Sequence, residues 1–367
     1  MATFVVALRE EKPGPNQGIE IVKKRLTYKS SGVDIASADK AKRKIRQLAR
    51  STFTPQVVKG IGGFGGFFAF KANEYEDPVL ISSVDSVGTK LKVAFMMDKH
   101  DSVGEDIVNH CVNDILVHGA KPLFFLDYIG MGKLYPKVVE QIVKGLSRGC
   151  RKAGCSLVGG ETAELPEFYQ KGEYDLAGCI VGVVEKKKIV YGSRIRPGDQ
   201  VIGLESSGLH TNGYSLARKV LFEVARLGTN DYAKELKTTV GKELLKIHRC
   251  YASVILSLLD EFEIKGMAHI TGGGIQGNLN RILPANCDAE ILADSWKIPP
   301  IFKLIRSQGD IDAEEMFKVF NMGMGMVLVA SKSETGRILT RLSSSKESAY
   351  RIGEITPGKG KVHLLNL

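Results

Sequence analysis

Acidic residues follow several predicted strands and helices in the first half of the chain. Asp85 ends an apolar stretch and runs into SVGTK, in which Lys90 offers a cation. Asp114 stands beside Asn113 within an apolar-periodic segment, and Glu161 directly follows the apolar run CSLV. Carboxylates that converge repel one another unless a hard divalent cation separates them, and Mg2+ bridging the phosphates of ATP is a usual occupant. The set therefore predicts a metal and nucleotide site, although each acid alone is more often a cap or a solvated group.

Two glycine-bearing turns in the second half have the character of anion-binding loops. SSGLHTNGYSL (206–216) directly precedes a predicted helix, whose first N–H groups and dipole attract an anion. HITGGG (269–274) follows a short apolar run and can form a backbone nest for phosphate. His210 and His269 lie in these loops and are candidate acids or bases near neutral pH. A capping turn and a plain flexible loop are the alternatives, and together the motifs predict a two-domain enzyme of phosphate esters and nucleotides.

The segment GIGGFG (60–65) satisfies the pattern G-x-G-x-x-G but lacks its structural context. Only two apolar residues precede it, and the aromatic run FGGFFAF follows in place of an amphipathic helix. It is therefore not read as a dinucleotide fingerprint, and a loop that closes over a phosphate or a tight turn remains. GEITPGKG (353–360) is also discarded, because Gly360 stands where a P-loop needs Ser or Thr.

Alternating strands and helices must position these residues. The sequence predicts strands over 77–85, 123–127, 155–162, 174–185, 201–208 and 324–330, and helices over 101–119, 136–153, 213–225 and 243–259. In the first of these helices Asp106, His110 and Asp114 form a polar stripe at steps of four. Glycines within 174–185 predict a bulge in that strand. The fold class is therefore α+β or α/β, with two domains that each pack a β-sheet with helices.

Composition sets the domain organisation and the compartment. A chain of 367 residues exceeds one ordinary core, and the turn-rich stretch KKKIVYGSRIRPGDQ predicts a boundary between domains 28–186 and 187–367. The first 27 residues (1–27) read as an N-terminal arm. No apolar run reaches the roughly 20 residues of a membrane span, and no secretory signal is recognised. Six cysteines without a C-x-x-C pair favour free thiols in the cytoplasm.

The net charge of +10 raises the possibility of a nucleic-acid-binding module. The basic clusters at 23–25 and 40–46 have almost no interleaved aromatic residues, so solvated helix faces are the preferred interpretation. We therefore expect no specific nucleic-acid partner. Attraction of anionic small molecules remains compatible with this charge.

The chain resembles the aminoimidazole ribonucleotide synthetase family. DILVHGAKP (114–122) matches the family signature D-x4-G-A-x-P. Further matching blocks occur in order along residues 28–357: YKSSGVDI (28–35), GIGGFGG (60–66), VDSVGTKLK (84–92), GGETAELP (159–166), YDLAGCIVGVVEK (174–186), SSGLHTNGYSL (206–216), AHITGGG (268–274) and EEMFKVFNMGMGM (314–326). Nine ordered blocks, counting CVNDILVHGAKPLFFLD (111–127) as one, make an accidental match very improbable.

This resemblance implies a homodimer whose N-terminal domains join their sheets, with ATP and Mg2+ as cofactors. It implies ring closure of formylglycinamidine ribonucleotide to aminoimidazole ribonucleotide, with release of ADP and phosphate. ATP binding is implied for Gly62, Gly63, Asp85, Thr89, Lys90, Asn113 and Asp114, and metal binding for Asp85, Asp114 and Glu161. Substrate binding is implied for His210, Thr211, Asn212, Thr271, Gly272 and Gly273, and catalytic roles for His269, His210, Lys90 and Asp114.

Some positions depart from the family pattern. Ser86 and Gly277 replace a glycine and an acid, and Met322 stands where a cysteine is usual. KIHRCYAS (246–253) replaces a Pro-Thr-Arg pattern. These departures concern the substrate loops more than the nucleotide site. Thiamine monophosphate kinase and selenophosphate synthetase share the carboxylate plan and are the alternative functions within the same superfamily.

Overall fold

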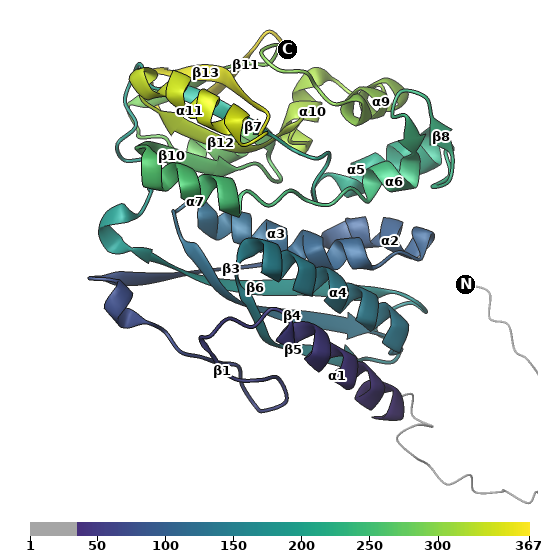
Figure 1. The fold of residues 1–367 in the computed structure, drawn as a ribbon. Coiled ribbons are helices and arrows are strands. Elements are labelled where there is room, and N and C mark those ends of the chain that lie inside the picture. Colours follow the sequence, from purple (N-terminus) through teal and green to yellow (C-terminus); the bar gives the residue numbers. More distant parts are fainter. Residues whose placement is uncertain (1–34) are drawn as a thin grey trace, which may run out of the picture.

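The protein is described by a computed structural model that covers residues 35–367. The predicted arm (1–27) and most of the block YKSSGVDI therefore lie outside the described residues. Within them the chain forms two large sheets, each packed with helices as the sequence predicts, and two small two-stranded sheets (Figure 1). The first is four-stranded with the order β3-β6-β4-β5, and the second is six-stranded with the order β10-β12-β7-β13-β11-β14.

Helices cover one face of the four-stranded sheet, which consists of β3 (Pro78–Ser86), β4 (Lys121–Met131), β5 (Ser156–Glu164) and β6 (Tyr174–Glu185). Figure 1 shows α3 (Asp101–Leu116) and α4 (Pro136–Ala153) on the side that faces the second domain. The other elements of this half are α1 (Ile35–Arg50), β1 (Val57–Lys59), β2 (Phe67–Phe68), η1 (Ala72–Glu74), η2 (Gly88–Lys90), α2 (Leu91–Met97) and η3 (Lys186–Lys188).

Two glycines allow α3 and α4 to cross in close contact. A Cβ on Gly104 would lie 2.0 Å from the carbonyl oxygen of Ile142, and one on Gly145 would lie 2.1 Å from that of Asp101. No larger side chain fits between the two backbones at this crossing. The contact fixes α3 on the sheet, and α3 carries the predicted polar stripe.

The sequence predicts a bulge in the strand 174–185, but the structure has the irregularity in a neighbouring strand. The pairing of β3 with β6 runs without interruption from Pro78 opposite Glu185 to Ser86 opposite Ala177. The irregularity lies in β4 instead, between Pro122 and Phe124. The glycines of β6 serve packing, because a Cβ on Gly178 would lie 2.1 Å from Cζ of Phe125.

The second domain packs helices around β7 (Gln200–Glu205) and β12 (Met324–Ala330), and every residue of β12 is buried. Its other strands are β8 (Tyr232–Ala233), β9 (Thr238–Thr239), β10 (Ile264–His269), β11 (Cys287–Leu292), β13 (Ala349–Pro357) and β14 (Val362–Leu365). Its helices are α5 (Tyr214–Arg218), η4 (Lys219–Val224), α6 (Val240–Leu244), α7 (Ala252–Glu261), α8 (Gly274–Leu279), η5 (Asn280–Ile282), α9 (Pro300–Gly309), α10 (Ala313–Val319) and α11 (Lys332–Ser344).

The helix predicted over 243–259 is interrupted in the structure. α6 ends at Leu244, residues 246–250 have no regular structure, and α7 begins at Ala252. Apolar periodicity continues across the break, so the sequence pattern does not reveal it. The cause is a set of contacts with α3.

No helix within residues 35–367 is long and apolar enough to cross a membrane. All six cysteines are free thiols.

Candidate active site between the two domains

The polar stripe of α3 binds the backbone of the segment 246–251. A carboxylate oxygen of Asp106 accepts the His248 N–H at 2.7 Å, and the Asn109 amide donates to the His248 carbonyl at 2.6 Å. One turn further along, Asn113 donates to the Arg249 carbonyl at 2.8 Å and accepts the Tyr251 N–H at 3.0 Å. Side chains of α3 thus satisfy backbone groups that a continuous helix would otherwise have paired, which explains the break between α6 and α7.

These contacts include Asn113, which the sequence predicts as an ATP-binding residue. Its side chain is fully buried, and both its amide oxygen and its amide nitrogen are bound to the segment 246–251. Both groups are thus occupied in this structure, and an ATP contact of Asn113 stays a prediction. Its role in the structure is to join the two domains.

Lys90 is likewise a buried contact between the domains. Its ammonium lies 2.8 Å from a carboxylate oxygen of Asp106, and neither side chain is exposed to solvent. It also donates to the carbonyls of Lys246 at 2.7 Å and His210 at 3.1 Å. Three donors thus meet three acceptors in this structure, and the contact of Lys90 with ATP phosphates and its catalytic role stay predictions. Burial lowers the pKa of Lys90 and raises that of Asp106, with each group opposing the shift of the other.

A chain of hydrogen bonds links residues of both domains; we call its six members the interdomain cluster: Asp85, His110, Thr211, His248, His269 and Asp114. Asp85 Oδ2 lies 2.9 Å from His110 Nε2, and His110 Nδ1 lies 2.7 Å from Thr211 Oγ1. Thr211 Oγ1 is 3.2 Å from His248 Nδ1. His248 Nε2 is 3.0 Å from His269 Nε2, and His269 Nδ1 is 2.8 Å from Asp114 Oδ1. The chain nearly closes, because Asp114 Oδ2 lies 3.8 Å from His110 Nε2.

The two carboxylates form the solvent-facing side of the cluster. The Asp85 and Asp114 side chains are 39% and 27% exposed, whereas those of His110 and His269 are 5% and 3% exposed. Burial acts to raise the pKa of both acids, but hydrogen bonds and the positive charge of the imidazoles lower it overall. Asp85 also accepts the N–H of Ser86, and Asp114 accepts the hydroxyl of Ser83. Both carboxylates are therefore ionised at neutral pH and available to a cation.

The imidazoles differ in their protonation. Burial acts against a charge on His110, but Asp85 and Asp114 raise its pKa overall. Burial lowers the pKa of His210, His248 and His269. His210 is 1% exposed, and its Nε2 accepts the N–H groups of Ser207 and Arg249. The ring of His210 is thus buried and bound to the backbone of Ser207 and Arg249, and its catalytic and substrate-binding roles stay predictions.

The two predicted substrate loops lie side by side next to the cluster. The N–H of Gly272 donates to the Asn212 side chain at 3.1 Å, which joins the loop at 206–213 to the loop at 270–274. Gly273 has φ of 94° and precedes α8, a left-handed conformation that favours glycine. Thr271 is bound to Asn278 of the same helix, and Thr89 contacts Ser215 across the domains. Both loops adjoin the cluster, because Thr211 belongs to the first and His269 directly precedes the second.

Glu161 does not join the cluster within one chain. It is exposed on β5, and β6 and β4 lie between β5 and β3, which carries Asp85. Three strand spacings of about 4.8 Å place the two residues roughly 14 Å apart. The expected convergence of the three acids therefore holds for Asp85 and Asp114 but not for Glu161.

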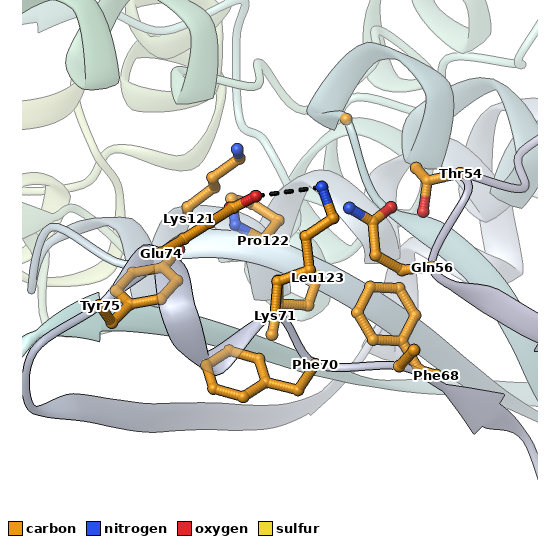
Figure 2. Close-up of a pocket in the computed structure, with 12 residues that line it drawn as sticks. Thr54, Gln56, Phe68, Phe70, Lys71, Glu74, Tyr75, Lys121, Pro122 and Leu123 are labelled. Carbon is orange, nitrogen blue, oxygen red and sulfur yellow. Dashed lines mark hydrogen bonds and ion pairs between the residues drawn. The ribbon is translucent and has the colours of Figure 1, made fainter.

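Gly62 and Gly63 also lie away from the cluster. They belong to the loop between β1 and β2, where Gly62 approaches the guanidinium of Arg46. Figure 2 shows a pocket beside this hairpin, lined by aromatic residues and by the ion pair of Lys71 with Glu74. Its volume of about 100 Å³ is below the roughly 300 Å³ at which ligand pockets begin, so it cannot enclose a nucleotide by itself.

His248 was not identified from the sequence, and His110 was recognised only as part of a stripe. The spacing of Asp106, His110 and Asp114 was the available signal for His110. For His248 the only signal was its position in KIHRCYAS, the block that departs from the family pattern. Its partners Thr211 and His269 are 37 and 21 residues away in the sequence, so local patterns do not show the contacts.

Both domains match models of one class of protein. Residues 72–184 match the N-terminal domain, and residues 196–365 the C-terminal domain, of AIR synthase related proteins. The phosphoribosylformylglycinamidine cyclo-ligase of Syntrophotalea carbinolica is 56% identical over 332 residues, which is 90% of this chain and 95% of that protein. That of Alkaliphilus oremlandii is 49% identical over 340 residues, covering 93% of this chain and 100% of that protein. The chain belongs to the phosphoribosylformylglycinamidine cyclo-ligase family.

Solved structures with low sequence identity share the fold. The thiamine-monophosphate kinase of Stenotrophomonas maltophilia superposes with a TM-score of 0.65 at 17% identity, covering 89% of this chain and 96% of that one. The hydrogenase maturation protein HypE in complex with ATP gives a TM-score of 0.63 at 17% identity, covering 86% and 88%. At this level of identity the likeness concerns the fold alone.

Proposed function

We propose that the protein is a ligase that closes the ring of formylglycinamidine ribonucleotide to aminoimidazole ribonucleotide, with consumption of ATP and release of ADP and phosphate. The step belongs to purine biosynthesis. The observation that carries this proposal is the 49–56% identity to cyclo-ligases, which extends over both domains and so covers both sides of the interdomain cluster.

The chemistry of ring closure fits a site built from charges and loops. A formyl oxygen is a poor leaving group, and transfer of the γ-phosphoryl group of ATP to it gives an iminophosphate and ADP. The amidine nitrogen then attacks the formyl carbon, the C–O bond breaks with loss of phosphate, and the nitrogen releases a proton. Positioning and charge neutralisation supply most of the rate enhancement in phosphoryl transfer. A nucleophile activated by a base is not required.

We assign the carboxylates of Asp85 and Asp114 to a divalent cation that accompanies ATP. Their oxygens are partly exposed and ionised, which suits a hard cation such as Mg2+. When bound, that cation would neutralise phosphate charge. The loops around Asn212 and Gly272 are assigned to the phosphate of the substrate, because they contact each other and adjoin the cluster through Thr211 and His269.

We also propose that the enzyme is a homodimer formed through the sheet of the first domain. The face of this sheet opposite α3 and α4 exposes large apolar side chains, among them Leu80 at 61%, Val84 at 70% and Tyr128 at 37%. The neighbouring β1–β2 hairpin adds Phe64 and Phe67. Several large exposed apolar side chains on one face of a sheet are unusual on a monomer and typical of a subunit interface. Glu161, which lies on β5 of the same sheet, would then stand near the partner subunit.

The oligomeric state can be tested with a single substitution that introduces a charge. Val84→Asp places a carboxylate in the centre of the proposed interface, and we expect a monomer in sedimentation velocity at micromolar concentration. Val224→Asp is the matched control, because Val224 is 57% exposed in the second domain. A wild-type protein that sediments as a monomer would contradict the proposal.

We place the enzyme in the cytoplasm, since its six thiols are all free.

The catalytic proposal is tested by ADP release from Mg2+ and ATP. The reaction is run without a second substrate and with formylglycinamidine ribonucleotide, thiamine monophosphate or selenide. We expect ADP only with the formylglycinamidine nucleotide, in step with aminoimidazole ribonucleotide. ADP with thiamine monophosphate or selenide alone would reassign the substrate, and no ADP in any mixture would refute an ATP-dependent enzyme of this class.

A further inference from the structure

We propose that a cavity between α9 and α10 in the second domain is a second ligand site, which binds a nucleoside monophosphate and alters substrate binding through the two substrate loops. The cavity has a volume of about 500 Å³, within the range of roughly 300–1,000 Å³ that is typical of small-molecule sites. Figure 1 shows both helices at the end of the second domain that is farther from the first domain. The effect on the loops, though not the cavity itself, rests on the proposed function, which assigns those loops to the substrate.

Two cations of α9 line the cavity without a counter-ion. Lys303 and Arg306 lie one turn apart, so their side chains are neighbours on one face of the helix. Both are exposed, and within residues 35–367 neither side chain has an ion-pair or hydrogen-bond partner. Two unpaired cationic donors suit a phosphate group, which a guanidinium binds through two parallel hydrogen bonds.

The other walls offer hydrogen-bond acceptors and an apolar surface. Asp310 and Asp312, between α9 and α10, are exposed and line the cavity. Their carboxylates repel a phosphate, which directs it toward α9, and they can accept hydrogen bonds from the hydroxyl groups of ribose. The half-buried side chains of Ile298, Ile311 and Ala313 add apolar surface for a flat base. Phosphate, sugar and base thus each have a matching wall, which favours a nucleoside monophosphate over a bare anion.

Packed aromatic rings link the cavity to the loop at 206–213. Phe302 lines the cavity and is fully buried, and its ring centroid lies 5.8 Å from that of Phe320. Phe320 in turn contacts the loop, because a Cβ on Gly213 would lie 2.3 Å from Cε1 of the Phe320 ring. Close packing transmits displacements, so a shift of Phe302 reaches Gly213 through one intervening ring.

The loop at 270–274 contacts α10 through its backbone. Phe317 of α10 lines the cavity, and a Cβ on Gly274 would lie 1.7 Å from the Phe317 carbonyl oxygen. The backbones of the helix and of the loop are therefore in direct contact. Both substrate loops thus touch residues that belong to the wall of the cavity or pack directly against it.

The turn at 321–323 joins the cavity to the first loop by hydrogen bonds. Met322 lines the cavity and has φ of 49°, a conformation that residues other than glycine rarely adopt. Next to it, the Asn321 amide donates to the Gly208 carbonyl at 2.9 Å, and the Gly323 carbonyl accepts the Ser206 N–H at 2.8 Å. A ligand that displaces Met322 therefore displaces the loop. Met322 is also a position at which the sequence departs from the family pattern.

The first measurement is calorimetric titration of the full-length protein with AMP, in the presence of Mg2+ and a non-hydrolysable ATP analogue that occupies the nucleotide site. We expect saturable binding with a dissociation constant below about 1 mM. Ribose 5-phosphate should bind more weakly and inorganic phosphate most weakly, because each lacks a part of the ligand that one wall contacts. The absence of saturable AMP binding in this range would overturn the proposal, as would equal affinities for the three compounds.

A double variant, Lys303→Gln with Arg306→Gln, tests the location of the site. Both side chains are exposed, so we expect the variant to fold, and the loss of charge-assisted hydrogen bonds should weaken AMP binding about 10- to 100-fold. Lys297→Gln is the matched control, because it removes an exposed cation next to Ile298 that does not line the cavity. It should leave the affinity within about twofold, since salt screens a charge at that distance. Unchanged AMP binding by the double variant would overturn the proposal.

The effect on the substrate loops is measured in the same mixture, in which the enzyme cannot turn over. Coupling between two sites usually changes an affinity by about fivefold or more, and the change is reciprocal. We therefore expect AMP to change the affinity for formylglycinamidine ribonucleotide by at least about fivefold in the wild type but not in the double variant. AMP binding without this change would refute the coupling. A protein that binds AMP through Lys303 and Arg306 but closes no ring in the activity assay would refute the proposed function and leave the site.

Discussion

The substitution Lys90→Met distinguishes a structural role of Lys90 from a role in phosphate binding. The substitution keeps an unbranched side chain of similar length and removes the charge. It leaves a carboxylate of Asp106 buried without its partner, and it leaves the carbonyls of His210 and Lys246 without their shared donor. The three acceptors belong to both domains, so the loss is felt across the domain boundary.

The expected loss of stability follows from the burial of the ion pair between Lys90 and Asp106. Breaking a buried ion pair by removing one partner costs about 3–5 kcal/mol, because an uncompensated charge stays in a low-dielectric environment. Asp106→Asn in addition should restore a large part of this, since the Asn oxygen can still accept the His248 N–H now found at 2.7 Å. Lys92→Met is the control. Lys92 is 39% exposed and paired with Glu173, and exposed pairs of this kind contribute at most about 1 kcal/mol.

The assay is urea unfolding of the four proteins, followed by the fluorescence of Trp296 and by circular dichroism. We expect Lys90→Met to be destabilised by about 3–5 kcal/mol, Lys92→Met by less than about 1 kcal/mol, and the double variant to lie between Lys90→Met and the wild type. A Lys90→Met protein with wild-type stability and no ATP turnover would refute the reasoning. That result would return Lys90 to the role of a phosphate ligand.

Three further predictions concern single side chains. Burial, with the charge of Glu161, raises the pKa of Asp127 to about 7, so the folded protein keeps a proton that the unfolded chain loses near pH 4. The free energy of unfolding of the wild type therefore falls as the pH rises between these two values. The stability of Asp127→Asn relative to the wild type should accordingly increase by about 2 kcal/mol from pH 5 to pH 8 in urea unfolding. Equal pH dependence in both proteins would contradict this. Gly178→Ala should lower the stability by about 1–3 kcal/mol in thermal unfolding, because the added methyl group clashes with Phe125. Gly336→Ala, on an open helix surface, should raise it by about 0.5–1 kcal/mol. A Gly178→Ala protein of unchanged stability would show that Phe125 can move. Asp114→Asn should lower ADP formation about 100-fold or more in a protein that still folds, with Asp98→Asn as the exposed control, and full activity would make the carboxylate structural.

The local sequence pattern was enough to predict a helix or strand where the segment is defined by which of its own residues are buried. The strand 174–185, the helix 136–153 and the strand 324–330 were predicted with the bounds that the structure gives them. In each case apolar residues repeat with one period, and Gly154 ends the helix in a left-handed conformation. The pairing of Asp85 with Asp114 was also predictable, since both lie near the ends of elements that share one sheet and its covering helix.

The errors arose where distant segments meet. Periodicity predicted one helix over 243–259, but side chains of α3 from more than 130 residues earlier bind the backbone of its centre. The same contacts bury Asn113 and Lys90, both predicted as nucleotide ligands, between the two domains, which the sequence did not indicate. Glu161 was expected beside Asp85 because both follow strands, and strand order, which the sequence does not reveal, placed them on opposite edges of the sheet.

The dependence of α3 on the segment 246–251 has a consequence during synthesis on the ribosome. Asp106 is translated 142 residues before His248, its backbone partner. At about 5–20 residues per second the helix waits roughly 7–30 s for the segment that completes it. Throughout that interval Asp106, Asn109 and Asn113 must stay hydrated, and Lys90 has only one of its three acceptors. The first domain can therefore reach its finished form only after the second has left the exit tunnel as far as residue 251, and a nascent chain stalled before residue 246 should remain a substrate for chaperones.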